Sequence, residues 1–109
     1  VKDWQWNLEE GVFFISDWEL QYFDIRENRF DLLARLGINL ENLLINKKND
    51  YLILSSDQEI LVYDLQTSYM TTILETEKIS SPVLDAEKDL LYFWGKLGDQ
   101  QGVYRISVK

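Results

Sequence analysis

The 109-residue chain contains neither cysteine nor histidine. Without cysteine it has no disulfide, no thiolate nucleophile and no cysteine-held zinc or iron–sulfur centre. Without histidine it lacks the commonest general base and the commonest transition-metal ligand. These absences predict that the chain is not an enzyme and that it holds no metal or other cofactor.

Carboxylates remain as candidates for acid–base chemistry, and some are close in sequence: Glu9 with Glu10, and Glu75 with Glu77. Two carboxylates hydrolyse glycosides when they face each other across a cleft. An acidic chain contains neighbouring carboxylates as a matter of composition, and the sequence places no two of them across a cleft. They therefore leave the prediction of a non-enzyme unchanged.

Positive charge and long apolar runs are also scarce. Eleven basic residues against nineteen acidic ones give a net charge of −8, which disfavours nucleic acid or an anionic membrane surface as the partner. No apolar run approaches the ~20 residues that a transmembrane helix needs. The first residue is Val1 and no signal peptide is visible, so we expect a piece of a longer protein whose compartment cannot be read directly.

Short apolar segments separated by turn residues fill the chain instead. Val12–Ile15, Glu19–Ile25 and Phe30–Leu36 have the length and the aromatic or β-branched content of strands. Leucines between residues 30 and 45 also have roughly helical spacing, so a helix is the alternative there. Gly37 and Asn39 interrupt that pattern and favour strands.

An internal repeat organises these segments. Val12–Ser16 aligns with Tyr51–Ser55 and then with Leu90–Trp94, at an offset of 39 each time. Downstream, Glu19–Ile25 aligns with Glu59–Leu65 at an offset of 40. A period near 40 with four strand-like runs per unit is typical of a β-propeller blade.

The second run of each unit is apolar at successive positions, which indicates a strand covered on both faces, as in stacked blades. We therefore predict an all-β fold: a single β-propeller region over residues 1–109, with repeat units at about 3–36, 42–76 and 82–108. The third unit has three strands, so the segment holds about 2.75 blades. A self-contained β-sandwich is the alternative architecture.

A closed propeller needs about four blades or more. We therefore expect these to be the last blades of a larger propeller. Isolated, the segment would expose apolar faces and strand edges, and we expect it to self-associate.

Several phrases resemble known propellers. LVYDLQT (residues 61–67) and LQYFDIR (residues 20–26) resemble strands of WD-repeat and TolB-like propellers. SDWELQYFDI, YLILSSDQEILVYDL and LLYFWGKLGDQQGVYRI resemble the C-terminal blades of the propeller region in bacterial PEGA-domain proteins. The Gly-His and Trp-Asp dipeptides of WD repeats and a PEGA segment are missing. The resemblance implies an interaction or carbohydrate-associated module at the cell envelope, outside the cytoplasm, and transfers no catalytic residues.

Candidate binding residues lie in the turns between second and third strands. Trp18 is predicted at a hairpin tip, where an exposed indole anchors a protein partner or a sugar ring. The alternative is that it folds back over a blade edge. Asp17 and Asp57 recur at matching positions, either as a polar rim that accepts hydrogen bonds or binds Ca²⁺ weakly, or as ordinary turn residues.

Two further pairs of identical residues are candidates for a role in the fold. Asp24 and Asp64 recur at the end of the third strand, where a structural role is expected. Trp4 and Trp6 are two apart and so share one strand face, either packed against a neighbouring blade or lining a channel as a stacking site.

The sequence thus predicts a non-enzymatic interaction or structural scaffold that binds protein or glycan on its loop face. It predicts no nucleic-acid partner and no membrane insertion by this segment. The alternative is a set of purely structural blades that complete a ring, with function elsewhere in the parent protein.

Overall fold

The computed structural model describes residues 1–8, 10–46, 48 and 50–108, and these form eleven strands in three antiparallel sheets. The first sheet contains β1 (Asp3–Asn7), β2 (Gly11–Ile15), β3 (Glu19–Asp24) and β4 (Arg29–Arg35). The second contains β5 (Asn42–Ile45), β6 (Tyr51–Ser55), β7 (Glu59–Asp64) and β8 (Met70–Glu75). The third contains β9 (Lys78–Asp85), β10 (Leu90–Leu97) and β11 (Gln100–Ser107).

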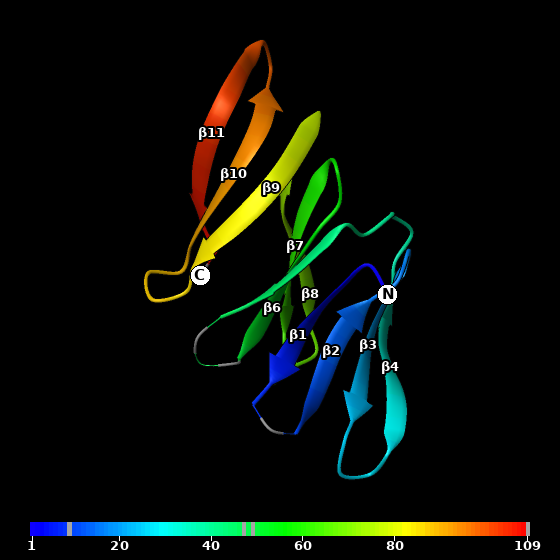
Figure 1. The fold of residues 1–109 in the computed structure, drawn as a ribbon. Coiled ribbons are helices and arrows are strands. Elements are labelled where there is room, and N and C mark those ends of the chain that lie inside the picture. Colours follow the sequence, from blue (N-terminus) through cyan, green and yellow to red (C-terminus); the bar gives the residue numbers. More distant parts are fainter. Residues whose placement is uncertain (9, 47, 49, 109) are drawn as a thin grey trace.

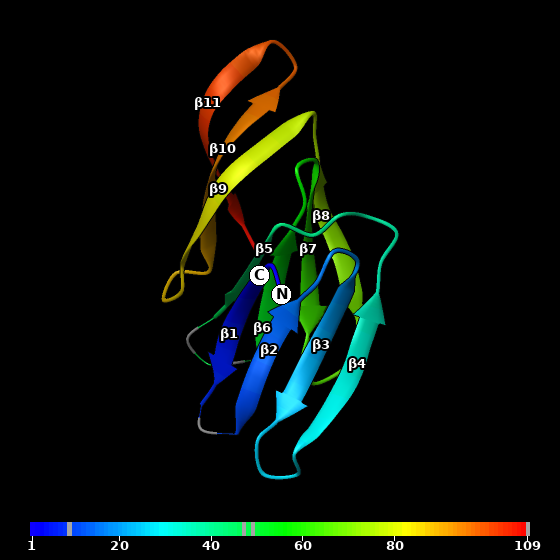
Figure 2. The ribbon, with the colours of Figure 1, turned by 45° about the vertical axis from the view of Figure 1, so that its right-hand side comes forward.

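The sheets follow one another along a body of 49 × 29 × 21 Å (Figures 1 and 2). Within each sheet the strands lie in chain order, so every connection is a hairpin. β1 contacts β5, and β5 contacts β9, which makes these the innermost strands. Among the residues described, none forms a helix with the length and apolarity needed to cross a bilayer.

This arrangement confirms the predicted all-β propeller fragment, with two four-stranded blades and one three-stranded blade. The β-sandwich alternative is wrong, because the strands form three successive sheets rather than two facing ones. The helical alternative for residues 30–45 is also wrong. Cross-strand pairing of β4 with β3 uses the backbone groups that a helix would need for itself.

The middle sheet shows why the four successive residues Tyr51–Leu54 of β6 are apolar or aromatic. Leu52 and Leu54 are fully buried against the first sheet, whereas Tyr51 and Ile53 are buried against the third. Side chains alternate between the two faces of a strand, so in a strand covered on both sides apolar residues follow one another directly, and the one polar side chain of β6, Ser55, donates a hydrogen bond to Asn42 Oδ1. Every residue of β6 is accordingly buried.

Two apolar cores result, one at each junction between sheets. The buried residues of the first core are Phe13, Ile15, Leu20, Leu40, Leu43, Leu52, Leu54, Leu61 and Tyr63. The buried residues of the second core are Tyr51, Ile53, Ile60, Ile79, Leu91, Phe93 and Val108. Each core is shared by two consecutive sheets, so the blades hold one another by apolar burial.

Strand register corrects the repeat alignment by one residue. Asp3 pairs with Ile15 in the first sheet, and Asn42 pairs with Ser55 in the second. The innermost strands therefore correspond at an offset of 39, but β2 and β6 correspond at an offset of 40. The extra residue lies in the β5–β6 connection. The alignment predicted from the sequence, which matches Val12 with Tyr51, is shifted by one residue and would place the side chains of β6 on the wrong faces of the sheet.

A buried tyrosine joins the second sheet to the third. Tyr51 is 5% exposed, and its hydroxyl donates a hydrogen bond to Asp89 Oδ1. Burial, together with the Asp89 carboxylate, raises the pKa of the Tyr51 hydroxyl above its ordinary value. Gly11 occupies the equivalent position in the first sheet, where the Tyr22 ring and the Phe23 carbonyl leave no room for a side chain.

We expect Gly11→Ala to destabilise the fold by about 1–3 kcal/mol, because the added methyl would overlap the Phe23 carbonyl oxygen and lie 2.5 Å from the Tyr22 ring. Gly102→Ala is the matched control within a strand, since a Cβ there meets nothing within 4 Å. Urea unfolding of the two variants measures the difference. Equal midpoints would show that the first sheet accommodates the methyl group.

We expect Tyr51 to make stability depend on pH above about 10, the ordinary tyrosine pKa. The folded state favours the neutral phenol of Tyr51. The stabilisation that Tyr51 contributes to the folded state is therefore fully present below that pH. The contribution is lost as pH rises through the raised folded pKa, because the unfolded chain releases the proton first. Urea unfolding of wild type and Tyr51→Phe from about pH 8 to about pH 11 should show the stability difference shrinking. A difference independent of pH would contradict this expectation.

Candidate functional site

The β2–β3 and β6–β7 turns form one rim of the blades and have the same backbone geometry. Ser16 N–H donates to the Glu19 carbonyl at 3.0 Å, and Ser56 N–H donates to the Glu59 carbonyl at 3.0 Å. Both turns therefore close in the same way, and they present their central residues at equivalent places.

The turn aspartates connect each blade to the next through their carbonyls. Asp17 O accepts from Leu40 N–H at 2.8 Å, and Asp57 O accepts from Ile79 N–H at 2.7 Å. Leu40 and Ile79 introduce the innermost strand of the following blade, so these bonds set where each new blade begins. The next residue of each turn accepts a hydrogen bond from the residue that follows the outermost strand of the same blade. The Trp18 carbonyl accepts from Leu36 N–H at 2.7 Å, and the Gln58 carbonyl accepts from Thr76 N–H at 2.8 Å.

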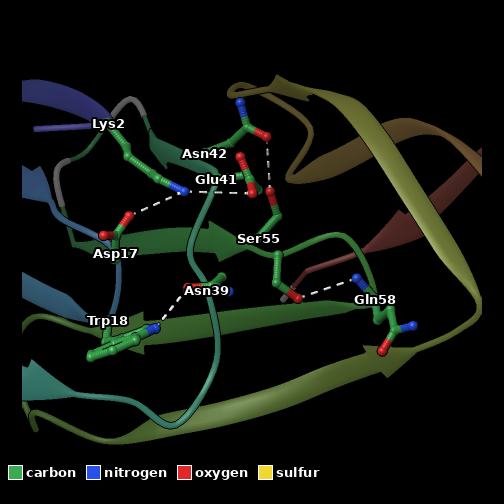
Figure 3. A network of polar contacts seen from close by, with 9 residues as sticks. Lys2, Asp17, Trp18, Asn39, Glu41, Asn42, Ser55 and Gln58 are labelled. Carbon is green, nitrogen blue, oxygen red and sulfur yellow. Dashed lines mark hydrogen bonds and ion pairs between the residues drawn. The ribbon is translucent and has the colours of Figure 1, made fainter.

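The side chain of Asp17 adds an exposed ion pair. Lys2 Nζ lies 3.3 Å from Asp17 Oδ1 and 3.6 Å from Glu41 Oε1, between the two carboxylates (Figure 3). Exposed pairs contribute at most about 1 kcal/mol. Asp17 and Asp57 lie in separate turns, and no group of three or more acidic side chains gathers to hold a metal ion in the described part of the chain.

Asp24 and Asp64 cap the turns at the opposite rim. Asp24 Oδ1 accepts from Glu27 N–H at 3.1 Å. Asp64 Oδ1 accepts from Gln66 N–H at 2.8 Å and from Thr67 N–H at 3.1 Å. Both carboxylates therefore satisfy backbone donors at the ends of the third strands, as Asp does in many turns.

Trp18 stands on the first rim and is 59% exposed. Its Nε1–H donates to Asn39 Oδ1 at 2.7 Å, and Asn39 lies in the connection to the second blade (Figure 3). The hydrogen bond fixes one edge of the ring and leaves most of its surface in solvent. The indole is thus held at one edge and exposed to solvent over much of its surface.

Two adjoining hollows of about 510 Å³ and about 300 Å³ share Trp18, Glu19 and Arg35 as lining residues. Arg35 Nη2 lies 2.8 Å from Glu19 Oε2, and Arg35 Nε donates to the same oxygen at 2.9 Å. Gln21 Nε2 donates to Glu19 Oε1 at 3.1 Å, so both carboxylate oxygens are engaged. The site therefore combines an aromatic surface with a fixed acid–base pair.

Trp18 was a candidate from the sequence, and the structure adds Arg35, Glu19 and Asn39 beside it. Glu19 and Arg35 are directly opposite in the β3–β4 register, and opposite charges at such positions pair. That signal was present once both strands were recognised. Asn39 carried no such signal, because its position in the irregular connection follows from the packing of two blades.

Trp4 and Trp6 lie on the outer face of the first sheet, away from the second. They are 50% and 54% exposed, and their rings meet edge to face at 5.9 Å. Neither of the other two sheets described in the structure covers that face, so packing against a neighbouring blade and lining a channel both stay predictions.

Two of the carboxylates that are neighbours in the sequence, Glu10 and Glu77, form ion pairs. Glu10 Oε1 lies 3.4 Å from Arg26 Nη2, and Glu77 Oε2 lies 3.4 Å from Lys96 Nζ. Glu9 lies outside the described residues.

Comparison with known proteins places the fold. No protein-family model and no curated protein matches the chain. The tricorn protease matches with a TM-score of 0.76 and 16% identity over 96% of this chain and 12% of that one. A protein described as a 6-phosphogluconolactonase, from Bacteroides uniformis, matches with a TM-score of 0.69 and 12% identity over 98% of this chain and 36% of that one. The first has β-propeller domains and the second a propeller-like fold, so the likeness shows a propeller-like fold.

The prediction that the chain is not an enzyme is wrong, because a protein described as a 6-phosphogluconolactonase has a similar propeller-like fold. At 12% identity that likeness shows the fold alone. Loops from different blades share a rim, so a site there draws residues from several blades. Missing histidine and cysteine in three blades therefore do not exclude catalysis.

We expect Asp64→Ala to destabilise the fold by about 1–3 kcal/mol, because two backbone amides lose a charged acceptor. Asp57→Ala should change stability by less than about 0.5 kcal/mol, because alanine keeps the carbonyl that bonds Ile79. Urea unfolding of both variants provides the comparison. A larger loss for Asp57→Ala would show that its carboxylate, not its carbonyl, supports the turn.

Proposed function

We propose that the chain is an interaction module: blades of a larger β-propeller that bind a glycan or a protein on the loop face around Trp18. The supporting observation is the exposed indole held by Asn39 beside two hollows. A large aromatic surface that is already fixed loses little conformational freedom on binding.

The groups around the indole favour a sugar ring as the ligand. The apolar face of a pyranose stacks on an indole, and its hydroxyls accept or donate hydrogen bonds at the ring edge. Arg35 supplies donors, and Glu19 and Asp17 supply acceptors, beside that surface. The larger hollow, about 510 Å³, lies within the range of small-ligand sites. A protein segment presenting polar side chains is the second ligand class for the same surface.

A purely structural role is the competing proposal, and one observation favours it. The Trp18–Asn39 hydrogen bond joins residues 21 apart and ties the turn to the connection between blades. In that role, the Trp18 indole positions the second blade, and the function of the propeller lies elsewhere in the parent protein.

The finer family resemblance also belongs to this proposal. The phrases LVYDLQT and LQYFDIR support a TolB-like or WD-repeat-like subtype, and the longer phrases support the propeller region of bacterial PEGA-domain proteins. On that basis we propose a single propeller region over residues 1–109 and a location at the cell envelope, outside the cytoplasm.

We expect Trp18→Ala to weaken oligosaccharide binding by about 30-fold or more, the loss typical of a central aromatic anchor. Isothermal titration calorimetry with defined cello-, chito-, xylo- and malto-oligosaccharides measures the affinities. Tyr69→Ala is the matched control: Tyr69 is 74% exposed, and it lies in the β7–β8 turn at the opposite rim.

The competing structural role has a different outcome. No oligosaccharide would bind, and Trp18→Ala and Asn39→Ala would lower the unfolding midpoint in urea by equal amounts. Under the binding proposal, Trp18→Ala removes affinity and leaves that midpoint close to wild type.

A further inference from the structure

A hollow of about 350 Å³ opens between the first and second sheets, at the rim opposite Trp18. The buried part of its wall is aromatic, because Phe13 and Tyr63 of the first core line it at 5% and 4% exposure. Its volume lies within the range of small-ligand sites. It shares no lining residue with the two hollows around Trp18, so it is a separate place where a small group can be enclosed.

The Tyr63 hydroxyl is a polar group in this wall that the fold leaves without a hydrogen bond. Tyr63 is buried, and its hydroxyl has no partner among the residues that the structure describes. In those same residues every polar side-chain atom that is sealed from solvent has a partner. The Tyr63 oxygen is therefore open to the hollow that the residue lines, where it can bond a ligand.

Tyr22 forms a neighbouring part of the wall and is fixed in place. Asn7 Nδ2 donates to the Tyr22 hydroxyl at 3.1 Å, and the Tyr22 ring lies against Phe13 with centroids 4.7 Å apart. The ring also lies over Gly11, where a Cβ would be 2.5 Å from it. The hollow thus has preformed aromatic walls, which attract cations and lose little freedom when a ligand binds.

Two carboxylates also line the hollow, and its described lining includes no basic side chain. Asp24 Oδ1 accepts from Glu27 N–H, which leaves Oδ2 without a hydrogen bond from the described part of the chain. Arg29 is opposite Asp24 in the strand register but bonds a different carboxylate. Glu10 pairs with Arg26 at 3.4 Å in solvent, where such pairs are weak. With a net charge of −8 on the chain, the hollow attracts cations.

We infer that this hollow binds a primary alkylammonium group. The aliphatic stem lies against Phe13 and Leu33, and the ammonium donates hydrogen bonds to the Tyr63 hydroxyl and to Asp24 Oδ2. An ammonium has three donors and no acceptor, which matches a wall whose open groups accept hydrogen bonds. A neutral alcohol would leave the carboxylate unpaired, and the carboxylates would repel an anion. The inference does not depend on the glycan site around Trp18.

NMR titration of the ¹⁵N-labelled chain with n-hexylammonium tests the inference. We expect saturable shifts at the amides of Tyr63 and Ser68, which line the hollow, and none at Trp18. The matched probes 1-hexanol and hexanoate carry the same stem with a neutral and an anionic end. Each should bind at least about tenfold more weakly than the ammonium, because neither pairs with the carboxylates.

Tyr63→Phe keeps the ring and removes only a hydroxyl that the fold does not use. We therefore expect its urea unfolding midpoint to stay that of wild type and its affinity for hexylammonium to fall about tenfold. Tyr92→Phe is the matched control, since Tyr92 lies in the third sheet and does not line the hollow. A purely structural Tyr63 predicts the opposite pattern, with an altered midpoint and unchanged affinity.

Asp24→Asn keeps an oxygen for Glu27 N–H and removes the charge. It should weaken hexylammonium binding about tenfold and leave binding of 1-hexanol unchanged. Asp99→Asn, at an exposed turn outside the hollow, is the matched control and should bind as wild type does.

Three outcomes would overturn the inference: no saturable binding, equal affinities for hexylammonium and 1-hexanol, or an affinity that Tyr63→Phe and Asp24→Asn both leave unchanged. Nα-acetyl-lysine methylamide carries the same ammonium on a peptide backbone and identifies its source. Tighter binding of this probe than of hexylammonium would assign the hollow to a lysine side chain of a protein, and the reverse order would assign it to a free amine.

Discussion

Burial on both faces of every sheet is the constraint on which this structure depends. A four-stranded sheet whose strands are apolar at successive positions cannot expose either side to water without a large loss of hydrophobic free energy. The second sheet satisfies the constraint within the chain, since β6 is buried throughout. The first and third sheets satisfy it on one side only. The stacking of blades, the two cores and the open apolar ends all follow from this condition.

The rim that carries the candidate site is a consequence of the stacking. In the first two blades, the turn between the second and third strands accepts a backbone hydrogen bond from the segment that begins the next blade. The accepting carbonyls are those of Asp17 and Asp57. Those bonds place the turn beside the interblade connection, where Asn39 meets the Trp18 indole. The candidate site is therefore positioned by main-chain geometry, and the side chains at its centre are free to differ from one blade to the next.

Charge is distributed according to the same constraint. Because the sheet faces are largely apolar, most acidic side chains of the described residues lie in turns and at strand ends, where several cap backbone amides or pair with Lys and Arg. Charged side chains that could contact a ligand are consequently concentrated on the rims, and the blades hold them in position. The Glu19–Arg35 pair beside Trp18 is the place where this polar rim adjoins an exposed aromatic surface.

The sequence alone determined the repeat, the strand-like runs and the two-sided burial of their second members, because these depend on periodicity along the chain. It also placed Trp18 at a turn. Only the tertiary structure decided the one-residue register shift between β2 and β6, the bond from Trp18 to Asn39 and the exposure of Trp4 and Trp6. Those features depend on which distant segments become neighbours when blades stack, and no local pattern contains that information.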